Sequence, residues 1–397
     1  MLHSSDIASP ETRPAPYQRD RFTWVAYGAL GYYSYMAVIL GPAMPFLRAE
    51  HNLNYTEGSL HVSLFALGVV ISGLLADRFA RWFGRRLNFW GGALGMGLGA
   101  ILLITTEPTI LTLSGTFLMG LGGGLLLVTI QASLSDRHGD KRAVALTESN
   151  VIASLCAILA PLLIGGFQSI GLGWRSAIGL GVGLIVLAFV FFRREPIPEK
   201  LTLTLNEENS PLLNKLPLVF WFYWAAIFFG VCCEICISFW STDYLKTNGG
   251  LSETSAASFI SLFFIAMAIG RIGGSYLVRH FESSLLLLIA IAIAGVGFPV
   301  FWLVADPTLK IAGLFVLGLG IANFFPLGLA AATGAAPRQA GMVSSRIALG
   351  AGAGVLGAPL ALGWIADRVG LTIAFGIFPV FLVLVLTVIL AARSSER

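Results

Sequence analysis

Long apolar stretches separated by short polar connections dominate the sequence from Arg21 onward. About twelve of them run for roughly 18–26 residues, which is enough for a helix to cross the hydrocarbon core of a bilayer. Backbone groups in lipid must be hydrogen-bonded internally, and these stretches are too long and continuous for barrel strands, so we expect helices. They lie near residues 22–46, 56–76, 87–105, 110–132, 143–167, 176–192, 216–240, 255–278, 284–304, 309–333, 342–365 and 371–392.

One polar connection, Arg193 to Lys215, is longer than the others and carries charges and prolines. It is typical of a linker between two halves. A repeat supports this division, because APLLIG at Ala160–Gly165 returns as APLALG at Ala358–Gly363 after about 198 residues. We therefore predict an all-α membrane protein with two pseudo-symmetric six-helix bundles. The expected boundaries are a tail at 1–21, a first bundle at 22–193, a linker at 194–215, a second bundle at 216–392 and a tail at 393–397.

Composition and charge placement define the environment of the chain. Hydrophobic residues make up 56% of it and charged residues only 12%, which excludes a water-soluble protein. Of the 25 lysines and arginines, about 18 fall in the tails and in connections that lie on one side of the membrane if the amino terminus is cytoplasmic. This asymmetry predicts cytoplasmic termini in a multi-pass protein of the inner membrane. The basic residues form no single patch, so nucleic acid is not an expected partner.

Beyond the first two residues of each predicted span, four charged residues remain inside: Glu148, Glu234, Arg271 and Arg346. Charge at such depth is costly unless it is paired or solvated, which makes these residues functional candidates. Glu234 lies in the seventh span without a nearby charge in the sequence, and a lone carboxylate can take up and release a proton. It is the predicted proton-coupling residue. The alternative is a carboxylate hydrogen-bonded to backbone or serine that has no role in turnover.

The segment from Gly73 to Arg86, GLLADRFARWFGRR, resembles the cytoplasmic signature G-x-x-x-D-R-x-G-R-R of the major facilitator superfamily, with an insertion of about four residues before Gly84. Three further motifs agree in position: the glycines at 120, 122 and 124, Ala160-Pro161, and Gly173-Trp174-Arg175. The resemblance covers the chain from about Arg21 to Ala392. It implies the fold of that superfamily, with twelve transmembrane helices, and a secondary active transporter that works by alternating access.

The resemblance also implies contacts between the two bundles. In this fold Asp77 lies near the start of the eleventh helix, beside Arg346, and the fifth helix packs on the eighth, which would bring Glu148 to Arg271. We expect these pairs to gate the cytoplasmic side, together with Arg78, Arg85 and Arg86 of the signature. Two alternatives stay open: Arg346 can extend to lipid phosphates, and Glu148 and Arg271 can form a permanent structural pair.

Substrate candidates come from the helices that line the cavity in this superfamily. The amide, hydroxyl and aromatic side chains on those helices are Tyr32, Tyr35, Gln131, Trp224, Ser238, Asn323 and Phe324. Arg271 is a further candidate, because Arg271-Ile-Gly-Gly resembles the arginine of carboxylate exchangers and a guanidinium binds carboxylates in a bidentate way. Many of the aromatic rings are instead expected at the membrane interface.

We find no sign of catalysis, of a cofactor or of a metal site. The four cysteines all fall within spans, and no G-x-x-x-x-G-K loop is present, so ATP is not the expected energy source. The expected partners are a small-molecule substrate, protons and the lipid bilayer, and a monomer is predicted. Export of a drug or metabolite and uptake of a sugar remain equally open, with carboxylate exchange through Arg271 and a non-transporting receptor as alternatives.

Overall fold

The computed structural model describes residues 17–198 and 216–396, and the predicted tail at 1–21 and linker at 194–215 lie largely outside these residues. Within the described part the ordered elements are all helical. They are α1 (Arg21–Val38), α2 (Leu40–His51), α3 (Tyr55–Thr105), α4 (Thr109–His138), a 3-10 turn (Gly139–Lys141), α5 (Arg142–Ser169), α6 (Trp174–Phe192), α7 (Leu218–Asn248), α8 (Glu253–Leu277), α9 (Ser283–Leu303), α10 (Pro307–Ile321), α11 (Phe324–Ala335), a 3-10 turn (Pro337–Gln339), α12 (Ala340–Val369), α13 (Leu371–Ala374) and α14 (Ile377–Glu396).

Among the described residues, nine helices are long and apolar enough to cross a membrane, or ten if the bent pair α1 and α2 is one span. Two of these, Tyr55–Thr105 with 51 residues and Thr109–Ser169 with 61, are too long for one crossing of a core about 30 Å thick. The first turns back at Gly84, whose φ of +79° suits glycine, and the second contains the 3-10 turn at Gly139–Lys141. Division at these two turns agrees with the twelve predicted crossings.

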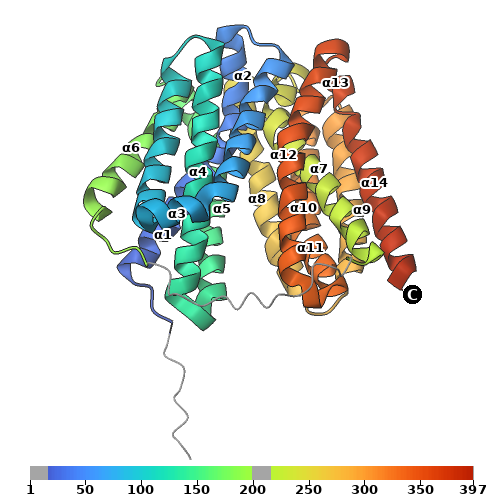
Figure 1. Ribbon diagram of the computed structural model, residues 1–397. Helices are drawn as coiled ribbons and strands as arrows, with labels where there is room; N and C mark the ends of the chain where they lie inside the picture. Colours follow the sequence, from blue (N-terminus) through green and yellow to red (C-terminus); the bar gives the residue numbers. More distant parts are fainter. Residues whose placement is uncertain (1–16, 199–215, 397) are drawn as a thin grey trace, which may run out of the picture.

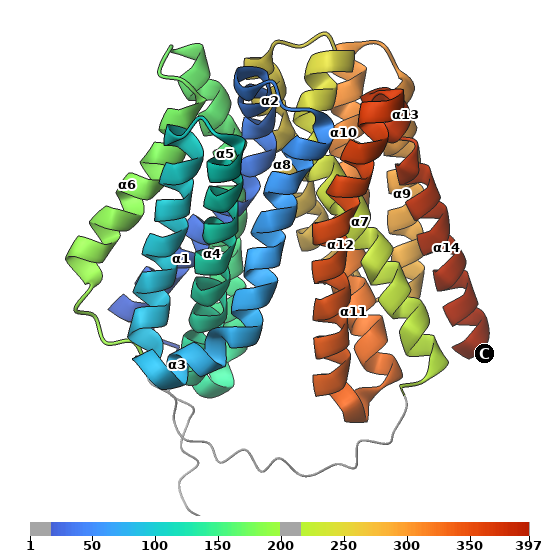
Figure 2. The ribbon, with the colours of Figure 1, turned by 45° about the horizontal axis from the view of Figure 1, so that its top comes forward.

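Two groups of helices stand side by side (Figures 1 and 2). We call α1–α6 the N-terminal half and α7–α14 the C-terminal half. Helix α6 ends and α7 begins at the same end of the molecule, which we call the linker side; the opposite end, where α2 ends and α3 begins, is the far side.

Glycines let the helices of each half approach backbone to backbone. A Cβ at Gly99 of α3 would lie 2.4 Å from the Gly115 carbonyl oxygen of α4, and one at Gly122 would lie 2.4 Å from the Met96 nitrogen. Helices α9 and α10 repeat this arrangement in the C-terminal half, where a Cβ at Gly313 would lie 2.4 Å from the Phe301 nitrogen. Small residues at such interfaces let helices pack closely in lipid, where no hydrophobic force drives them together.

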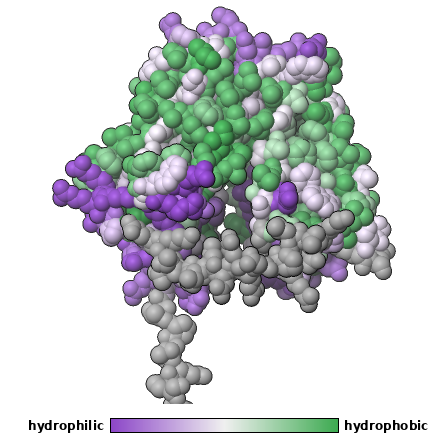
Figure 3. Space-filling model, viewed as in Figure 1, coloured by the Kyte–Doolittle hydropathy of each residue, from purple (hydrophilic) through white to green (hydrophobic). Residues whose placement is uncertain are grey.

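The outer surface suits a bilayer. Figure 3 shows hydrophobic residues over the middle of the molecule, with hydrophilic residues gathered toward its two ends. Large apolar side chains are exposed, including Leu184, Val296 and Val383. In water such a surface would drive aggregation, whereas in lipid it is the solvated face. The chain is a multi-pass membrane protein.

The close contact of α3 with α4 gives a first prediction. Gly122→Val places two methyl groups where even a Cβ collides with backbone, so we expect a clear loss of stability, by about 1–3 kcal/mol or more. Gly183→Val is the matched control, because a Cβ at Gly183 meets no atom within 4 Å. Thermal unfolding followed in detergent should show a lower Tm for Gly122→Val only. Equal Tm values for the two variants would contradict the packing argument.

Candidate functional site

A buried ion pair joins the two halves at the far side. Arg48, in the last turn of α2, lies 2.5 Å from the carboxylate of Asp243 in α7, and the two side chains are only 14% and 5% exposed. The Arg48 guanidinium also lies over the ring of Tyr55, 3.6 Å from its centroid, and 5.8 Å from the ring of Trp240. Because buried charges are stable only when partnered, this cluster favours contact between the halves.

Asp367 makes a second contact between the halves. It lies in the last turn of α12 and accepts hydrogen bonds from the backbone N–H groups of Tyr55 (2.7 Å) and Thr56 (2.8 Å), and from the Thr56 hydroxyl (2.5 Å). The first N–H groups of a helix have no partner within the helix, and the positive end of its dipole favours a carboxylate. Asp367 of one half therefore caps α3 of the other.

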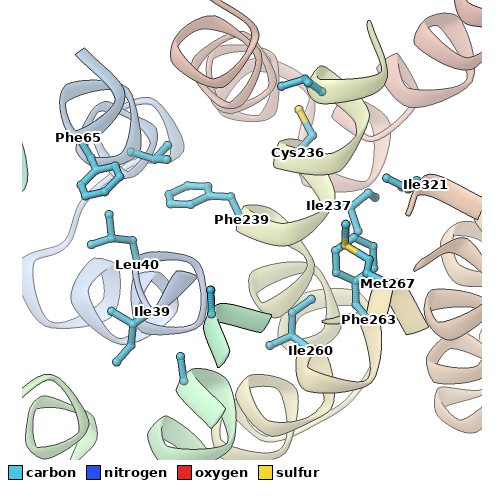
Figure 4. Packing of buried hydrophobic residues seen from close by; sticks show 14 of the residues in the cluster. Ile39, Leu40, Phe65, Cys236, Ile237, Phe239, Ile260, Phe263, Met267 and Ile321 are labelled. Atoms are coloured by element: carbon cyan, nitrogen blue, oxygen red, sulfur yellow. The ribbon is translucent and has the colours of Figure 1, made fainter. Parts of the chain in front are cut away.

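Apolar and backbone contacts complete the far-side closure. Phe239 of α7 points toward Leu40 of α2 and Phe65 of α3 (Figure 4). A Cβ at Gly41 would lie 2.7 Å from the Ser238 carbonyl oxygen, so α2 and α7 touch there through their backbones. Toward the middle of the interface, the Ser63 hydroxyl donates to the Leu356 carbonyl at 2.7 Å.

The linker side differs, because its ion pairs in the described residues stay within one half. Arg19 pairs with Glu148 (2.6 Å) and Arg137 pairs with Asp20 (2.5 Å), both in the N-terminal half. Partial burial disfavours charged Asp20, but hydrogen bonds from Thr23 and Arg137 hold the pKa of this carboxyl below its ordinary value. Figure 3 shows the surface hollowed between the halves at this side. The structure is closed at the far side and open at the linker side.

The expected gate pairs are not formed in this conformation. Glu148 contacts Arg19 and accepts a hydrogen bond from Tyr27 (3.0 Å), whereas Arg271 contacts Glu234, so Glu148 and Arg271 each have another partner. Asp77 and Arg346 are both exposed, and no hydrogen bond or ion pair joins them in the described part of the chain. The physical reason is the separation of the halves at the linker side.

The arginines of the signature segment hold the N-terminal half together. Arg85 contacts Asp136 at 2.7 Å, and Arg86 donates to the backbone carbonyl of Arg193. Arg78 is exposed, with its guanidinium 5.8 Å from the ring centroid of Trp82. Among the described residues, all three contact their own half in this conformation.

Glu234 and Arg271 form a pair at the inner end of the opening. Their closest atoms are 3.4 Å apart, and the side chains are 31% and 45% exposed. Glu234 lies one helical turn toward the linker side from Ser238, where α7 meets Gly41 of the other half. The Arg271 Nε donates to the Ala322 carbonyl at 3.4 Å, at the break between α10 and α11. The sequence indicated a lone carboxylate; the structure corrects this, because Glu234 has an arginine partner.

Several predicted substrate residues contact other groups of the C-terminal half. The Asn323 amide donates to the Gly270 carbonyl (2.7 Å), and the Trp224 indole donates to the Arg346 carbonyl (2.8 Å). The Phe324 side chain is buried and packs against Gly230, where an added Cβ would lie 3.0 Å from the Phe324 Cβ. These groups fix the packing of the C-terminal half.

The other candidates are spread over the molecule. The Tyr32 and Tyr35 hydroxyls donate to the carbonyls of Ala93 and Ala177 within the N-terminal half. Gln131 is exposed, and half-buried Ser238 donates to a carbonyl one turn earlier in α7. The structure therefore brings Ser238, Glu234 and Arg271 into one region, and leaves the two tyrosines in another.

Comparison with known proteins identifies the family. The sequence profile described as Major Facilitator Superfamily matches residues 25–310. The chain belongs to the Major Facilitator Superfamily.

Multidrug resistance protein MdtL of Escherichia coli O81 (strain ED1a) is 30% identical over 198 residues, which cover 46% of this chain and 50% of that protein. MdtL of Salmonella paratyphi B is 30% identical over 200 residues, with 46% and 49% covered. The chain thus spans about half the length of the curated relatives it matches.

Solved structures confirm the superfamily fold. A bacterial homolog of the human lysosomal transporter Spinster is 15% identical, with a TM-score of 0.77 over 96% of this chain and 98% of that one. A peptide transporter, POT, crystallised with sulfate, is 18% identical, with a TM-score of 0.75 and 94% of both chains covered. At these identities the likeness establishes the fold alone.

Sequence reasoning missed Arg48, Asp243 and Asp367. All three lie just beyond the ends of the predicted spans, where a charged residue is ordinary and carries no functional signal. A usable signal existed, because Arg48 and Asp243 have opposite charge and fall at similar depth in spans of different halves. Depth alone, however, does not say which spans are neighbours.

The far-side cluster gives a second prediction. Asp243→Asn leaves Arg48 buried without a charged partner, and breaking a buried pair in this way costs about 3–5 kcal/mol. We expect the far side to open, seen as longer distances between spin labels placed on the two halves there. Glu253→Gln is the matched control, because Glu253 pairs with Lys246 at the same side but within one half. An unchanged distance distribution in Asp243→Asn would refute the role of the pair.

Proposed function

We propose that this superfamily member is a secondary active transporter that exports a small amphipathic organic solute in exchange for protons. The observation that carries the proposal is the asymmetry of the interface, which is closed at the far side and open at the linker side, with the Glu234–Arg271 pair at the inner end of the opening. With the predicted topology the linker side is cytoplasmic, so the opening faces the cell interior. Alternating access requires such a one-sided opening.

The relatives favour export over sugar uptake. MdtL is named a multidrug resistance protein, and it matches this chain over about half of its length. Helix α7, which carries Glu234, also presents aromatic rings toward the linker side, such as Trp224 stacked on Phe228. Aromatic rings suit an amphipathic solute better than a polyhydroxylated sugar, which needs many hydrogen-bond partners.

The Glu234–Arg271 pair supplies a means of coupling. When a proton binds the Glu234 carboxylate, its charge is lost and the attraction to Arg271 falls. The Arg271 guanidinium then leaves a net positive charge at the pair. This charge disfavours binding of a cationic solute and favours its release. The proton and a cationic solute thus compete for the same carboxylate, and this competition is the differential binding that an exchanger needs.

The linker-side gate completes the cycle. We propose that Asp77 and Arg346 meet when the halves close at the linker side, while Arg48 and Asp243 separate at the far side. Each state then holds charged contacts that the other lacks, which makes the two states discrete alternatives. A non-transporting receptor has no use for gates on both sides.

Carboxylate exchange through Arg271 is the second candidate. Its support is the exposed guanidinium at the inner end of the opening. Its weakness is the carboxylate of Glu234 beside it, which repels an anionic substrate as long as Glu234 is charged. We therefore rank it below proton-coupled export.

Proton coupling gives a third prediction. In proteoliposomes with an imposed pH gradient, Glu234→Gln should abolish gradient-driven movement of the transported solute while counterflow without a gradient continues. A panel of cationic, neutral and anionic amphipathic dyes identifies the solute class. Glu50→Gln is the matched control, because Glu50 is paired with Arg175 at the far-side end of the N-terminal half. Gradient-driven transport at the wild-type level in Glu234→Gln would contradict the coupling role.

The linker-side gate gives a fourth prediction. On a background without the four native cysteines, Asp77→Cys combined with Arg346→Cys should form a disulfide only in conditions that close this side, because the two Cα atoms must approach within about 7 Å. Asp77→Cys with Arg393→Cys is the control pair. Absence of the cross-link in every condition, with folding and transport intact, would overturn the gate.

A further inference from the structure

A cavity of about 440 Å³ opens within the N-terminal half, between α1, α5 and α6. It faces outward rather than toward the C-terminal half: Leu159 and Leu184, which line it, are 48% and 56% exposed. Helix α6 is the outermost helix of this half in both ribbon views (Figures 1 and 2). The cavity therefore opens to the region that lipid occupies, and it is separate from the Glu234–Arg271 pair.

The lining is aliphatic and aromatic except for a few polar groups. Tyr32 and Tyr35 line the cavity, but their hydroxyls already donate to backbone carbonyls. Two donors remain. The Arg21 guanidinium is 65% exposed, with Glu195 at 3.4 Å, and the Trp90 indole N–H is buried without a hydrogen-bond partner in the described residues.

The unpartnered Trp90 donor calls for an acceptor from outside the chain. Trp90 is only 5% exposed, so water outside the cavity does not reach its N–H. A buried N–H without a partner is unfavourable, because it has lost its bonds to water and gained none. Since Trp90 lines the cavity, a ligand with a carbonyl or phosphate oxygen there would satisfy it.

The donors and the apolar lining are arranged along one axis. Arg21 begins α1 and Phe192 ends α6, so both mark the linker-side mouth, where the guanidinium lies over the Phe192 ring. Trp90 follows the Gly84 turn by six residues, and so lies a short distance inside. Tyr35 lies fourteen residues after Arg21, about 21 Å deeper along a helix. The cavity thus runs from a cationic mouth to an apolar end across about one leaflet of the bilayer.

We propose that this cavity binds one anionic phospholipid of the linker-side leaflet. The phosphate lies near Arg21, an ester carbonyl oxygen accepts the hydrogen bond of the Trp90 indole, and an acyl chain extends along α1, α5 and α6 toward Tyr35. The cationic mouth matches the phosphate, the free Trp90 donor below it matches the ester, and the apolar depth matches the acyl chain. A lipid in the leaflet presents these three parts in the same order. Bound there, the lipid fills the space between α6 and the rest of its half.

The lining offers a variant that fills the cavity without disturbing the packing. Gly28 lines it, and a Cβ at this position meets no atom within 4 Å, so Gly28→Leu extends into the cavity. Gly183→Leu is the matched control, because Gly183 is also open but is not among the lining residues. Size-exclusion profiles and Tm values establish that both variants fold.

The test uses full-length protein in vesicles that contain phosphatidylglycerol with a photoreactive diazirine in one acyl chain. Labelled peptides are mapped by mass spectrometry. We expect labelling concentrated at the cavity residues of α1, α5 and α6, reduced several-fold in Gly28→Leu and unchanged in Gly183→Leu. Labelling spread evenly over the lipid-facing helices, or unchanged in Gly28→Leu, overturns the proposal.

Two further variants test the headgroup and the ester. Arg21→Gln should remove the preference for phosphatidylglycerol over phosphatidylcholine, and Arg393→Gln should leave it unchanged. Trp90→Phe should weaken labelling by an ester-linked probe and not by an ether-linked one, which lacks the carbonyl. Displacement of the probe by a transported solute would assign the cavity to the transport route and refute the lipid assignment. Transport assays are not needed for any of these readouts.

Discussion

The buried ion pair of Arg48 and Asp243 is the contact on which the rest of the conformation depends. It joins the halves at one end while the other end is open, with half-buried Glu234 and exposed Arg271 at the inner end of that opening. An apolar contact alone would bind the halves without responding to conditions. A buried charged contact is stable only while its two charges are paired and shielded from water. Entry of water at the far side therefore weakens the attraction between Arg48 and Asp243. This conditional stability is what an interface that must open requires.

The architecture was predictable because the bilayer constrains the chain so strongly. Span length, placement of basic residues and the repeated APL segment gave two helical halves, and the superfamily fold confirms them. The glycines at 120, 122 and 124, which supported the resemblance, lie where α4 packs closely on α3. Local turns were harder to predict. The insertion before Gly84 does not by itself show that the chain reverses at this glycine, and the reversal depends on its positive φ.

The partners of the charged residues could not be predicted in the same way. Glu234 and Arg271 are 37 positions apart on different helices, and Arg19, which pairs with Glu148, lies in a segment that the sequence marks only as a polar tail. The orientation of Tyr32 and Tyr35 was also hidden, because helices that are apolar on every side carry no pattern that tells the lipid-facing side from the cavity side. Pairing and orientation depend on neighbours that are distant in sequence.

The glycine contacts within each half have a mechanical consequence. Because α3 and α4, and likewise α9 and α10, touch through their backbones, there is little side-chain material between them to deform. Each half then moves as a stiff body, so a tilt that separates the far-side cluster also displaces the linker-side end of the half. For a body about 30 Å long, a tilt of only ~10° moves one end relative to the other by ~5 Å. A rearrangement of a few side chains around Arg48 is thereby converted into a displacement the size of a small solute.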